Sequence, residues 1–186
     1  SAPNGTFRTT GSLPDTFNQP VAIRSLGQAG AGPITITARK IDMSTGQISS
    51  LTFDPPGSNS QRSEPITLSA DEIITQGINS DLVTINSPKV TINSGFLVND
   101  ATIDPKIYSI NARDQTVTIQ NTRTPGSPTN ITLPAGSTLK ANLVLENNTE
   151  FSAGVILDGT VKSSVPGSSS LTINGDSTLT GSIGNG

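Results

Sequence analysis

Residues 83–103 read VTINSPKVTINSGFLVNDATI, and this stretch decides the fold class. Two copies of VTIN are separated by a Ser87-Pro88 corner, and a third apolar segment follows Ser94-Gly95. Alternation of apolar and polar residues is the period of a β-strand. The stretch predicts three short strands and three corners in a turn of about 20 residues. The side chains expected to share one core are Val83, Ile85, Val90, Ile92, Leu97 and Ile103.

The same apolar-Thr-apolar pattern returns throughout the chain. No window keeps a helical period, because Gly, Pro, Asn and β-branched residues interrupt each candidate, and we expect almost no helix. Threonine suits the outward positions, since its branched Cβ favours an extended backbone. Besides the two VTIN segments, the pattern occurs at 34–36, 66–68, 117–119, 131–133 and 171–173.

Longer matches make the pattern an internal repeat. PITITARKI at 33–41 matches PITLSADEI at 65–73 without a gap, and ITLPAGSTLKA at 131–141 matches LTINGDSTLTG at 171–181. Repeats of about 20 residues with irregular spacing favour a β-solenoid, in which coils stack about 4.8 Å apart through main-chain hydrogen bonds. The chain would then hold about eight or nine coils.

The pattern leaves one fold alternative open, a β-sandwich or jelly roll, in which antiparallel hairpins with one wet face give the same alternation. Asn-Gly hairpin signals are scarce and most bends resemble corners, which favours the solenoid. We expect residues 1–25 to form an extended arm or cap and residues 26–186 to form the solenoid. No convincing cap is visible at either end, so we expect the coils to continue into neighbouring coils, covalently or in a polymer.

Composition narrows the classes of function. Apolar residues make up 32% of the 186, aromatic residues 3% and charged residues 13%, and the formal net charge is -3. Valine and isoleucine must therefore supply a narrow core, beneath a polar and weakly charged surface. No basic stripe interleaves with aromatics, which disfavours nucleic-acid binding. The apolar runs are far too short for membrane insertion.

The segment ITITARKIDMSTGQISSLTF at 34–53, together with the next repeat, resembles the repeats of filamentous-haemagglutinin-like exoproteins. The C-terminal LTINGDSTLTGSIGNG looks like the repeats of autotransporter passengers. The resemblance implies an all-β, right-handed parallel β-helix. It also implies secretion through an outer-membrane partner and a role in adhesion, biofilm or cell contact, with no catalytic residues to transfer.

The residues themselves offer little chemistry. With no His and no Cys, the chain lacks the parts of Ser-His-Asp, Cys-His and His-based metal sites. We expect no enzyme activity, no cofactor and no specific metal site. A polysaccharide-active β-helix enzyme using a carboxylate pair remains the weaker alternative. The candidate carboxylates, which we interpret as corner residues, are Asp54, Asp71, Glu72, Asp100, Asp104, Asp114 and Asp158.

We therefore predict an extracellular, cell-surface adhesin or fibre segment that binds a glycan or receptor. The alternative is a subunit of a homopolymeric filament, joined end to end or by strand donation. Segments 26–33, 54–65, 120–130 and 162–170 each precede an apolar-Thr-apolar strand, and they would project along one edge if those strands share a side. Possible contacts to an anionic or polar glycan in these loops are Arg62, Arg123 and Lys162. Glycan acceptor sequons begin at Asn4, Asn130 and Asn147.

Overall fold

The computed structural model is all-β, with no helix among the residues that it describes, which are 2–10, 13–14, 20–27, 32–52, 65–80, 82–96, 116–140 and 142–184. The predicted class is thereby confirmed at the level of an all-β, mostly parallel fold. The strands are β1 (Ala2–Arg8), β2 (Leu13–Pro14), β3 (Pro20–Gly27), β4 (Ile34–Met43), β5 (Gln47–Thr52), β6 (Ile66–Ser69), β7 (Glu72–Asn79), β8 (Leu82–Asn86), β9 (Lys89–Phe96), β10 (Thr116–Gln120), β11 (Thr129–Thr132), β12 (Ser137–Lys140), β13 (Asn142–Leu145), β14 (Thr149–Phe151), β15 (Val155–Asp158), β16 (Val161–Ser163), β17 (Leu171–Ile173) and β18 (Thr178–Leu179).

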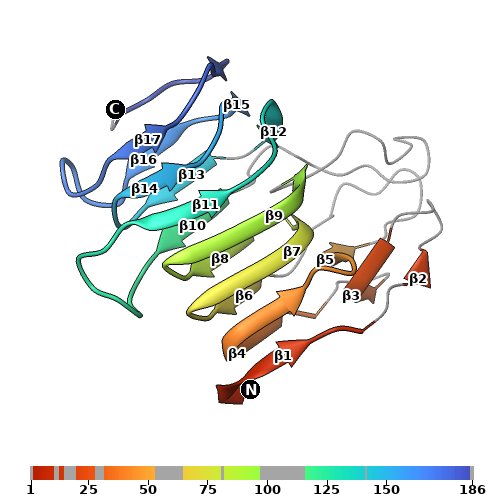
Figure 1. Ribbon diagram of the computed structural model, residues 1–186. Coiled ribbons are helices and arrows are strands. Elements are labelled where there is room, and N and C mark those ends of the chain that lie inside the picture. Colours follow the sequence, from red (N-terminus) through yellow and green to blue (C-terminus); the bar gives the residue numbers. More distant parts are fainter. Residues whose placement is uncertain are drawn as a thin grey trace.

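The main sheet follows an eleven-strand path that curls into a half-barrel (Figure 1). From β4, one arm runs through β6, β8, β10, β13 and β16, and we call it the first wing. The second wing runs from β4 through β7, β9, β11, β14 and β17. Strands β1, β2, β3 and β5 join this sheet off the path, and β12, β15 and β18 form a separate small sheet. Among these described strands, only the pair β2 and β3 is antiparallel.

Rows of aliphatic side chains cross the strands of the first wing. Val83 pairs with Ile66 on one side and Val117 on the other, and Ile85 lies between Leu68 and Ile119 in the same way. All of these side chains are buried. The intervening threonines point outward, so Thr35, Thr67, Thr84 and Thr118 stand in register on the outer face. Strand alternation therefore separates a dry face from a hydroxyl-bearing one.

The second wing contains the longest inward row. The row crosses seven strands, and its five inner members are buried while the first and last are only partly buried. Like side chains in parallel register stack on one another, which closes a narrow core without many aromatic rings. In order, the row is Phe7, Ile41, Ile73, Val90, Ile131, Phe151 and Ile173.

The predicted core residues Val83, Ile85, Val90 and Ile92 are confirmed as buried, each at most 1% exposed. Leu97 and Ile103 lie outside the described residues. The parallel pairing removes the basis of the β-sandwich alternative, which required antiparallel hairpins. The repeats at 33–41 and 65–73 lie side by side in register over their paired residues.

The predicted turn of about 20 residues is not kept along the chain. Ile66 pairs with Val83, 17 positions on, but Val83 pairs with Val117, 34 positions on. Among the described residues, the first wing has six strands, counting β4. We call one first-wing strand together with the second-wing strand that follows it a level, and insertions lengthen some levels. The corner predicted at Ser94-Gly95 lies within β9, beside a register shift in the pairing with β7. Within residues 1–25, predicted to form an arm or cap, β1 pairs with β4.

Candidate functional site

Every level of the half-barrel passes from the first wing to the second at one corner, which we call the wing corner. β4 passes it without a break, and three levels cross it in two or three residues, such as Ala70-Asp71 or Ser87-Pro88. Two levels cross it through longer loops, 121–128 between β10 and β11 and 164–170 between β16 and β17. Both loops project on the same side of the molecule (Figure 1). The two loops are the candidate recognition surface, because binding groups commonly reside on loops held by a rigid scaffold.

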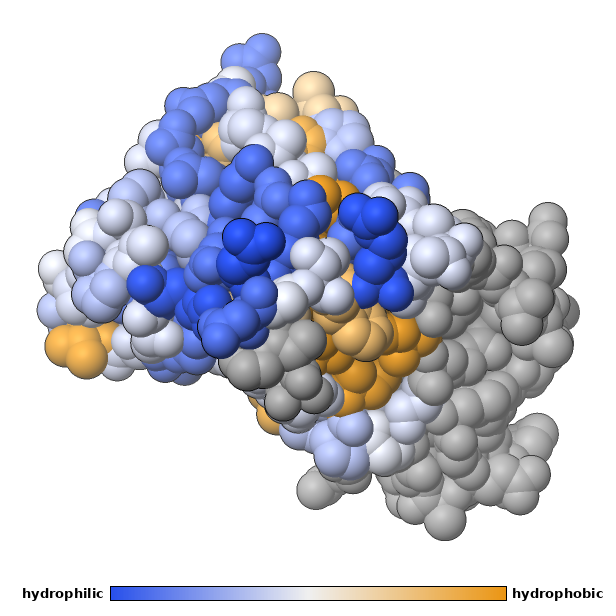
Figure 2. Space-filling view, turned by 60° about the horizontal axis from the view of Figure 1, so that its bottom comes forward, coloured by the Kyte–Doolittle hydropathy of each residue, from blue (hydrophilic) through white to orange (hydrophobic). Residues whose placement is uncertain are grey.

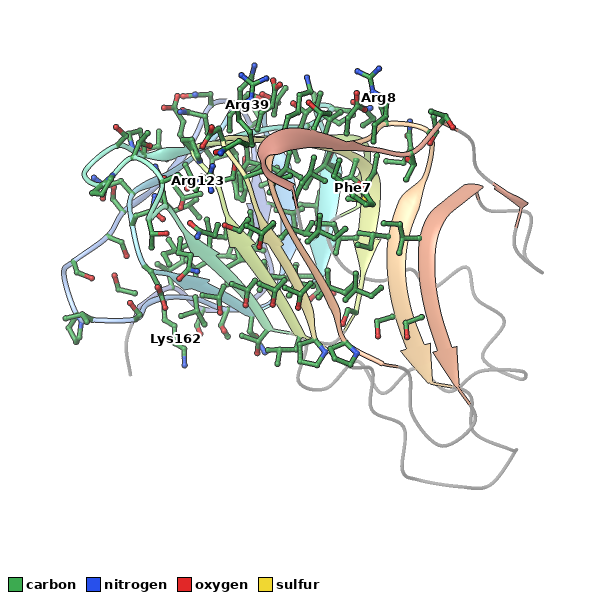
Figure 3. All side chains as sticks on the ribbon, turned by 90° about the horizontal axis from the view of Figure 1, so that it is seen from below. Phe7, Arg8, Arg39, Arg123 and Lys162 are labelled. Atoms are coloured by element: carbon green, nitrogen blue, oxygen red, sulfur yellow. The ribbon has the colours of Figure 1, made fainter. Side chains whose placement is uncertain are left out.

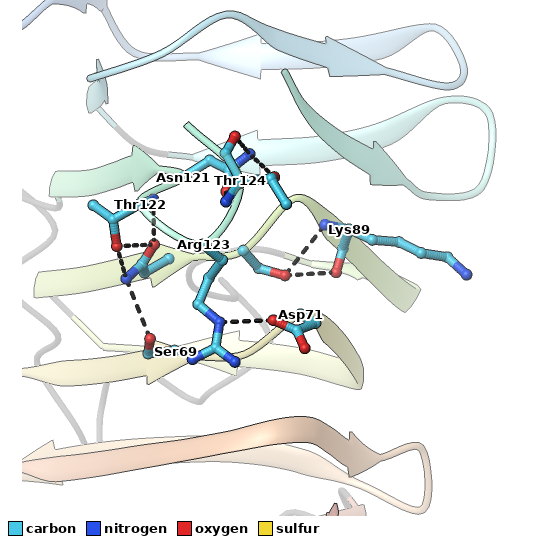
Figure 4. A network of polar contacts seen from close by, with 9 residues as sticks. Ser69, Asp71, Lys89, Asn121, Thr122, Arg123 and Thr124 are labelled. Atoms are coloured by element: carbon cyan, nitrogen blue, oxygen red, sulfur yellow. Dashed lines mark hydrogen bonds and ion pairs between the residues drawn. The ribbon is translucent and has the colours of Figure 1, made fainter. Parts of the chain in front are cut away.

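Loop 121–128 is organised by Asn121, which is 7% exposed. The Asn121 side-chain amide donates to Thr124 Oγ1 at 2.8 Å and to the Ser127 carbonyl at 3.1 Å. Asn121 Oδ1 accepts from the Thr124 backbone N–H at 3.0 Å (Figure 4). Asparagine forms such turns because its side chain imitates a backbone amide. Asn121 was not among the predicted site residues, although NTRTPGSP at 121–128 contains an asparagine followed by a Pro-Gly turn.

Asn86 ties the base of this loop to two lower levels. Its amide nitrogen donates to Thr122 Oγ1 at 2.8 Å and to Ser69 Oγ at 3.2 Å. Its Oδ1 accepts from the Thr122 backbone N–H at 2.9 Å. Side-chain hydrogen bonds at Asn86 thus link neighbouring levels. They hold the base of the loop against the first wing.

Arg123 is an anchor of the loop. Its Nε donates to Asp71 Oδ1 at 2.7 Å, and the Arg123 side chain is only 24% exposed (Figure 4). Arg123 is thus engaged with a carboxylate of a lower level. Lys162, on β16, is exposed and points away from the side on which Arg8 and Arg39 lie (Figure 3). Arg62 lies outside the described residues.

We predicted that four loops project along one edge, which requires the strands that follow them to lie in the same wing. Those strands lie in two different wings. The strands at 34–36 and 66–68 pair with each other in the first wing. The strands β11 and β17 belong to the second wing, each pairing with β14. The four segments therefore fall into two pairs: 26–33 and 54–65 precede strands of the first wing, and 120–130 and 162–170 precede strands of the second wing. The prediction was wrong because the same apolar-Thr-apolar pattern occurs in both wings. Strand propensity does not indicate which wing a strand occupies.

Loop 164–170 is rich in hydroxyl groups and is fixed at its end. Ser169 Oγ donates to the Leu145 carbonyl at 3.0 Å, and the Ser170 backbone N–H donates to Asn148 Oδ1 at 3.0 Å. A tight turn is closed by the Ser168 N–H, which donates to the Val165 carbonyl at 3.0 Å. Val165 is 60% exposed at the loop surface. The loop thus presents serines and one apolar side chain on a fixed frame.

Three of the seven candidate carboxylates are described, and each has a partner. Asp71 pairs with Arg123, and Asp158 Oδ1 accepts from Thr180 Oγ1 at 2.9 Å. Glu72 lies between two lysines on the second wing. Asp54, Asp100, Asp104 and Asp114 lie outside the described residues. Within the described ranges, His, Cys, Asp and Glu form no group of three that could hold a metal ion.

Glu72 and its lysines form the clearest electrostatic feature. Glu72 Oε2 lies 2.6 Å from Lys40 Nζ, and Oε1 lies 2.7 Å from Lys89 Nζ. Hydrogen bonds from Lys40 and then Lys89 hold the pKa of Glu72 below its ordinary value of 4.5, against the opposing effect of burial. A carboxyl whose pKa is lowered in the folded state stabilises the fold above its unfolded pKa and loses that contribution as pH falls.

Replacing Glu72 with Gln should therefore lower the free energy of unfolding by about 1 kcal/mol near pH 7. The difference between the two proteins should shrink as pH falls below about 4.5, through the lowered pKa of Glu72, because the wild-type carboxylate is then protonated. Urea denaturation at about pH 7 and about pH 3 measures both effects. An equal deficit at the two pH values would show that the ion triplet contributes nothing.

The sequons differ in accessibility. Asn4 and Asn130 are exposed. The Asn147 amide donates to Thr129 Oγ1 at 3.0 Å and to the Asn148 carbonyl at 2.8 Å, and its Oδ1 is buried. A glycan on Asn147 would break these contacts.

Comparison with protein-family models, curated proteins and solved structures yields no match. In the part of the chain that the structure describes, no helix has the length and apolar character needed to cross a membrane.

Proposed function

We propose that this chain is a β-solenoid segment of an extracellular, cell-surface adhesin, and that loops 121–128 and 164–170 bind a neutral glycan. The fold proposal is supported by the repeated crossing of one corner and by parallel register maintained across the levels. In a solenoid, each level stacks on the last, which gives a stiff rod. Such a rod suits a role in attachment or biofilm, without catalysis.

The observation that carries the proposal is the pair of long loops on a corner that other levels cross in two or three residues. The exposed residues of both loops are hydroxyl-bearing, Gly or Pro residues, together with Val165. Hydroxyl groups both donate and accept hydrogen bonds, which matches the hydroxyls of a sugar. Arg123 is the single charged residue of the two loops and is already paired with Asp71. The ligand class is therefore a neutral polysaccharide.

The neighbouring level supplies a template for the test. Ile119 pairs with Leu145 and Thr129 pairs with Thr149, so equivalent positions in the two levels can be compared. Eight residues, 121–128, connect Gln120 to Thr129, whereas two residues, Asn147 and Asn148, make the equivalent connection in the neighbouring level. Replacing 121–128 with Asn-Asn should weaken binding to immobilised dextran or mannan at least about ten-fold, the loss of one or two good contacts. Surface plasmon resonance measures the binding, and circular dichroism should show an unchanged β spectrum.

The matched control removes hydroxyl groups away from both loops. The double variant Thr35→Ala, Thr67→Ala changes the outer face of the first wing and should keep most of the binding. Hyaluronan serves as the acidic comparison and should bind less well than the neutral polymers. Unchanged dextran and mannan binding after loop replacement, or stronger binding to hyaluronan, would count against a neutral-glycan surface on these loops.

A further inference from the structure

The β17 end of the half-barrel has an open apolar groove. It has a volume of about 350 Å³, and its apolar lining includes Leu145, Val161, Leu171, Ile173 and Ile183. Ile183 is 71% exposed, and Leu171 and Ile173 are only partly buried. The groove is the end of the core, where inward rows stop without a side chain above them.

Unpaired strand edges border this groove. β17 pairs with β14 on one side, and no described strand pairs with its other side. β16 receives only an isolated bridge between Val161 and Ile183. A strand edge with free N–H and C=O groups is a template for pairing with another strand. The geometry at this end therefore suits an added parallel strand.

The opposite end of the half-barrel, where β1 lies beside β4, also has a strand edge with no described partner. β1 is its last strand, and its single described partner is β4. Phe7 begins the inward row that ends at Ile173, and both are partly buried. Figure 2, which brings the β1 end of Figure 1 forward, shows apolar surface beside polar surface on this face. The first and last side chains of one inward row, Phe7 and Ile173, therefore lie at the two opposite ends of the half-barrel.

Charge distinguishes the two ends. In the described ranges 2–10 and 32–46 there are three basic residues and one acidic residue, whereas 142–184 contain one basic and four acidic residues. A net positive end and a net negative end attract each other, and like ends repel. This complementarity favours one arrangement of two copies, β1 end to β17 end, over the two symmetric ones.

We propose that copies of this chain associate head to tail, with β1 of one copy forming the next parallel strand after β17 of another. Continued register places Phe7 on Ile173 and Thr6 beside Thr172. The added Phe7 ring covers the end of the row at Ile173, and the main chain of β17 gains a partner. A contact between unlike surfaces does not close on itself, so it extends into a filament. The inference goes beyond the glycan-binding role and holds whether or not the loops bind sugar.

Engineered disulfides test the register, because the chain has no cysteine. Thr6 and Thr172 are exposed, and residues paired across parallel strands are about 4.8 Å apart, within reach of a disulfide. The double variant Thr6→Cys, Thr172→Cys should form a ladder of covalent oligomers on mild oxidation. The matched control is Thr6→Cys, Thr132→Cys, since Thr132 is exposed on the inner strand β11.

The control should not form the ladder. Equal ladders from both variants would indicate random collision, and the absence of a ladder from the first variant would remove the proposed register. Either result overturns the proposal.

Sedimentation of the unmodified chain provides a second test. Its weight-average mass should at least double over a hundred-fold rise in concentration, and high salt should reduce the association. Ile173→Lys, at a partly exposed edge position, should weaken association at least ten-fold while keeping the β spectrum. A constant monomer mass, closed dimers or an unaffected Ile173→Lys variant would each overturn head-to-tail assembly.

Discussion

Replacing Phe151 with alanine should lower the free energy of unfolding by about 3–5 kcal/mol. Phe151 is fully buried and is among the largest of the fully buried side chains. It lies between Ile131 and Ile173 in the long inward row, so its removal leaves a cavity with apolar walls above and below. The surrounding strands are held by main-chain pairing and cannot collapse fully into that space.

Chemical denaturation followed by circular dichroism measures this loss. Ile85→Ala, in the middle of the first wing, should cost about 2–4 kcal/mol because the deleted side chain is smaller. Ile156→Ala is the control, since Ile156 is 40% exposed and its change should stay within about 0.5 kcal/mol. A Phe151→Ala loss no larger than that of Ile156→Ala would mean that the row is not closely packed.

Replacing Gly154 with alanine should cost about 3 kcal/mol, the upper part of the range for overpacked sites. A Cβ at Gly154 would lie 2.0 Å from the Asp176 carbonyl oxygen of the next level. Because the obstacle is backbone, relief requires the 174–180 segment to move away. That movement breaks the hydrogen bond from the Val155 N–H to Ser177 Oγ and the pairing of β15 with β18. Greater proteolytic sensitivity near Asp176 should accompany the lost stability.

Gly126→Ala is the matched glycine control. Gly126 has a φ of 84°, yet a Cβ there meets nothing within 4 Å. Its cost is therefore backbone strain alone, about 1–2 kcal/mol. Denaturation of both variants separates strain from steric conflict. If Gly154→Ala were no more destabilising than Gly126→Ala, the close approach of the two levels would be relieved at little cost.

Several features were predictable because they depend on local pattern. Alternation predicted the buried positions Val83 and Ile85 and the outward Thr84. The gapless repeat at 33–41 and 65–73 is visible in the sequence, and its two copies pair in register because equal lengths of strand and corner stack without adjustment.

The second repeat shows where the pattern stops being sufficient. The match of 131–141 with 171–181 aligns Leu139 with Leu179, and both pair with Leu157 of an intervening level. In the preceding strands, however, Ile131 and Ile173 both pair with Phe151. The sequence match aligns Ile131 with Leu171, so the structural equivalence differs from it by two positions. The intervening level reads FSAGVILD and does not resemble its neighbours. Pairing responds to inward volume and hydrogen-bond register, which a different sequence can satisfy equally well.

By itself, the sequence determined that this protein is all-β, with small aliphatic side chains facing inward and hydroxyl groups facing outward, because strand alternation is a local property of the chain. Only the tertiary structure decided how many residues separate paired strands, which loops share a corner, and that Arg123 pairs with Asp71. These depend on contacts between residues far apart in sequence. The free energy of such contacts is set by register and packing across levels, and local pattern does not encode it.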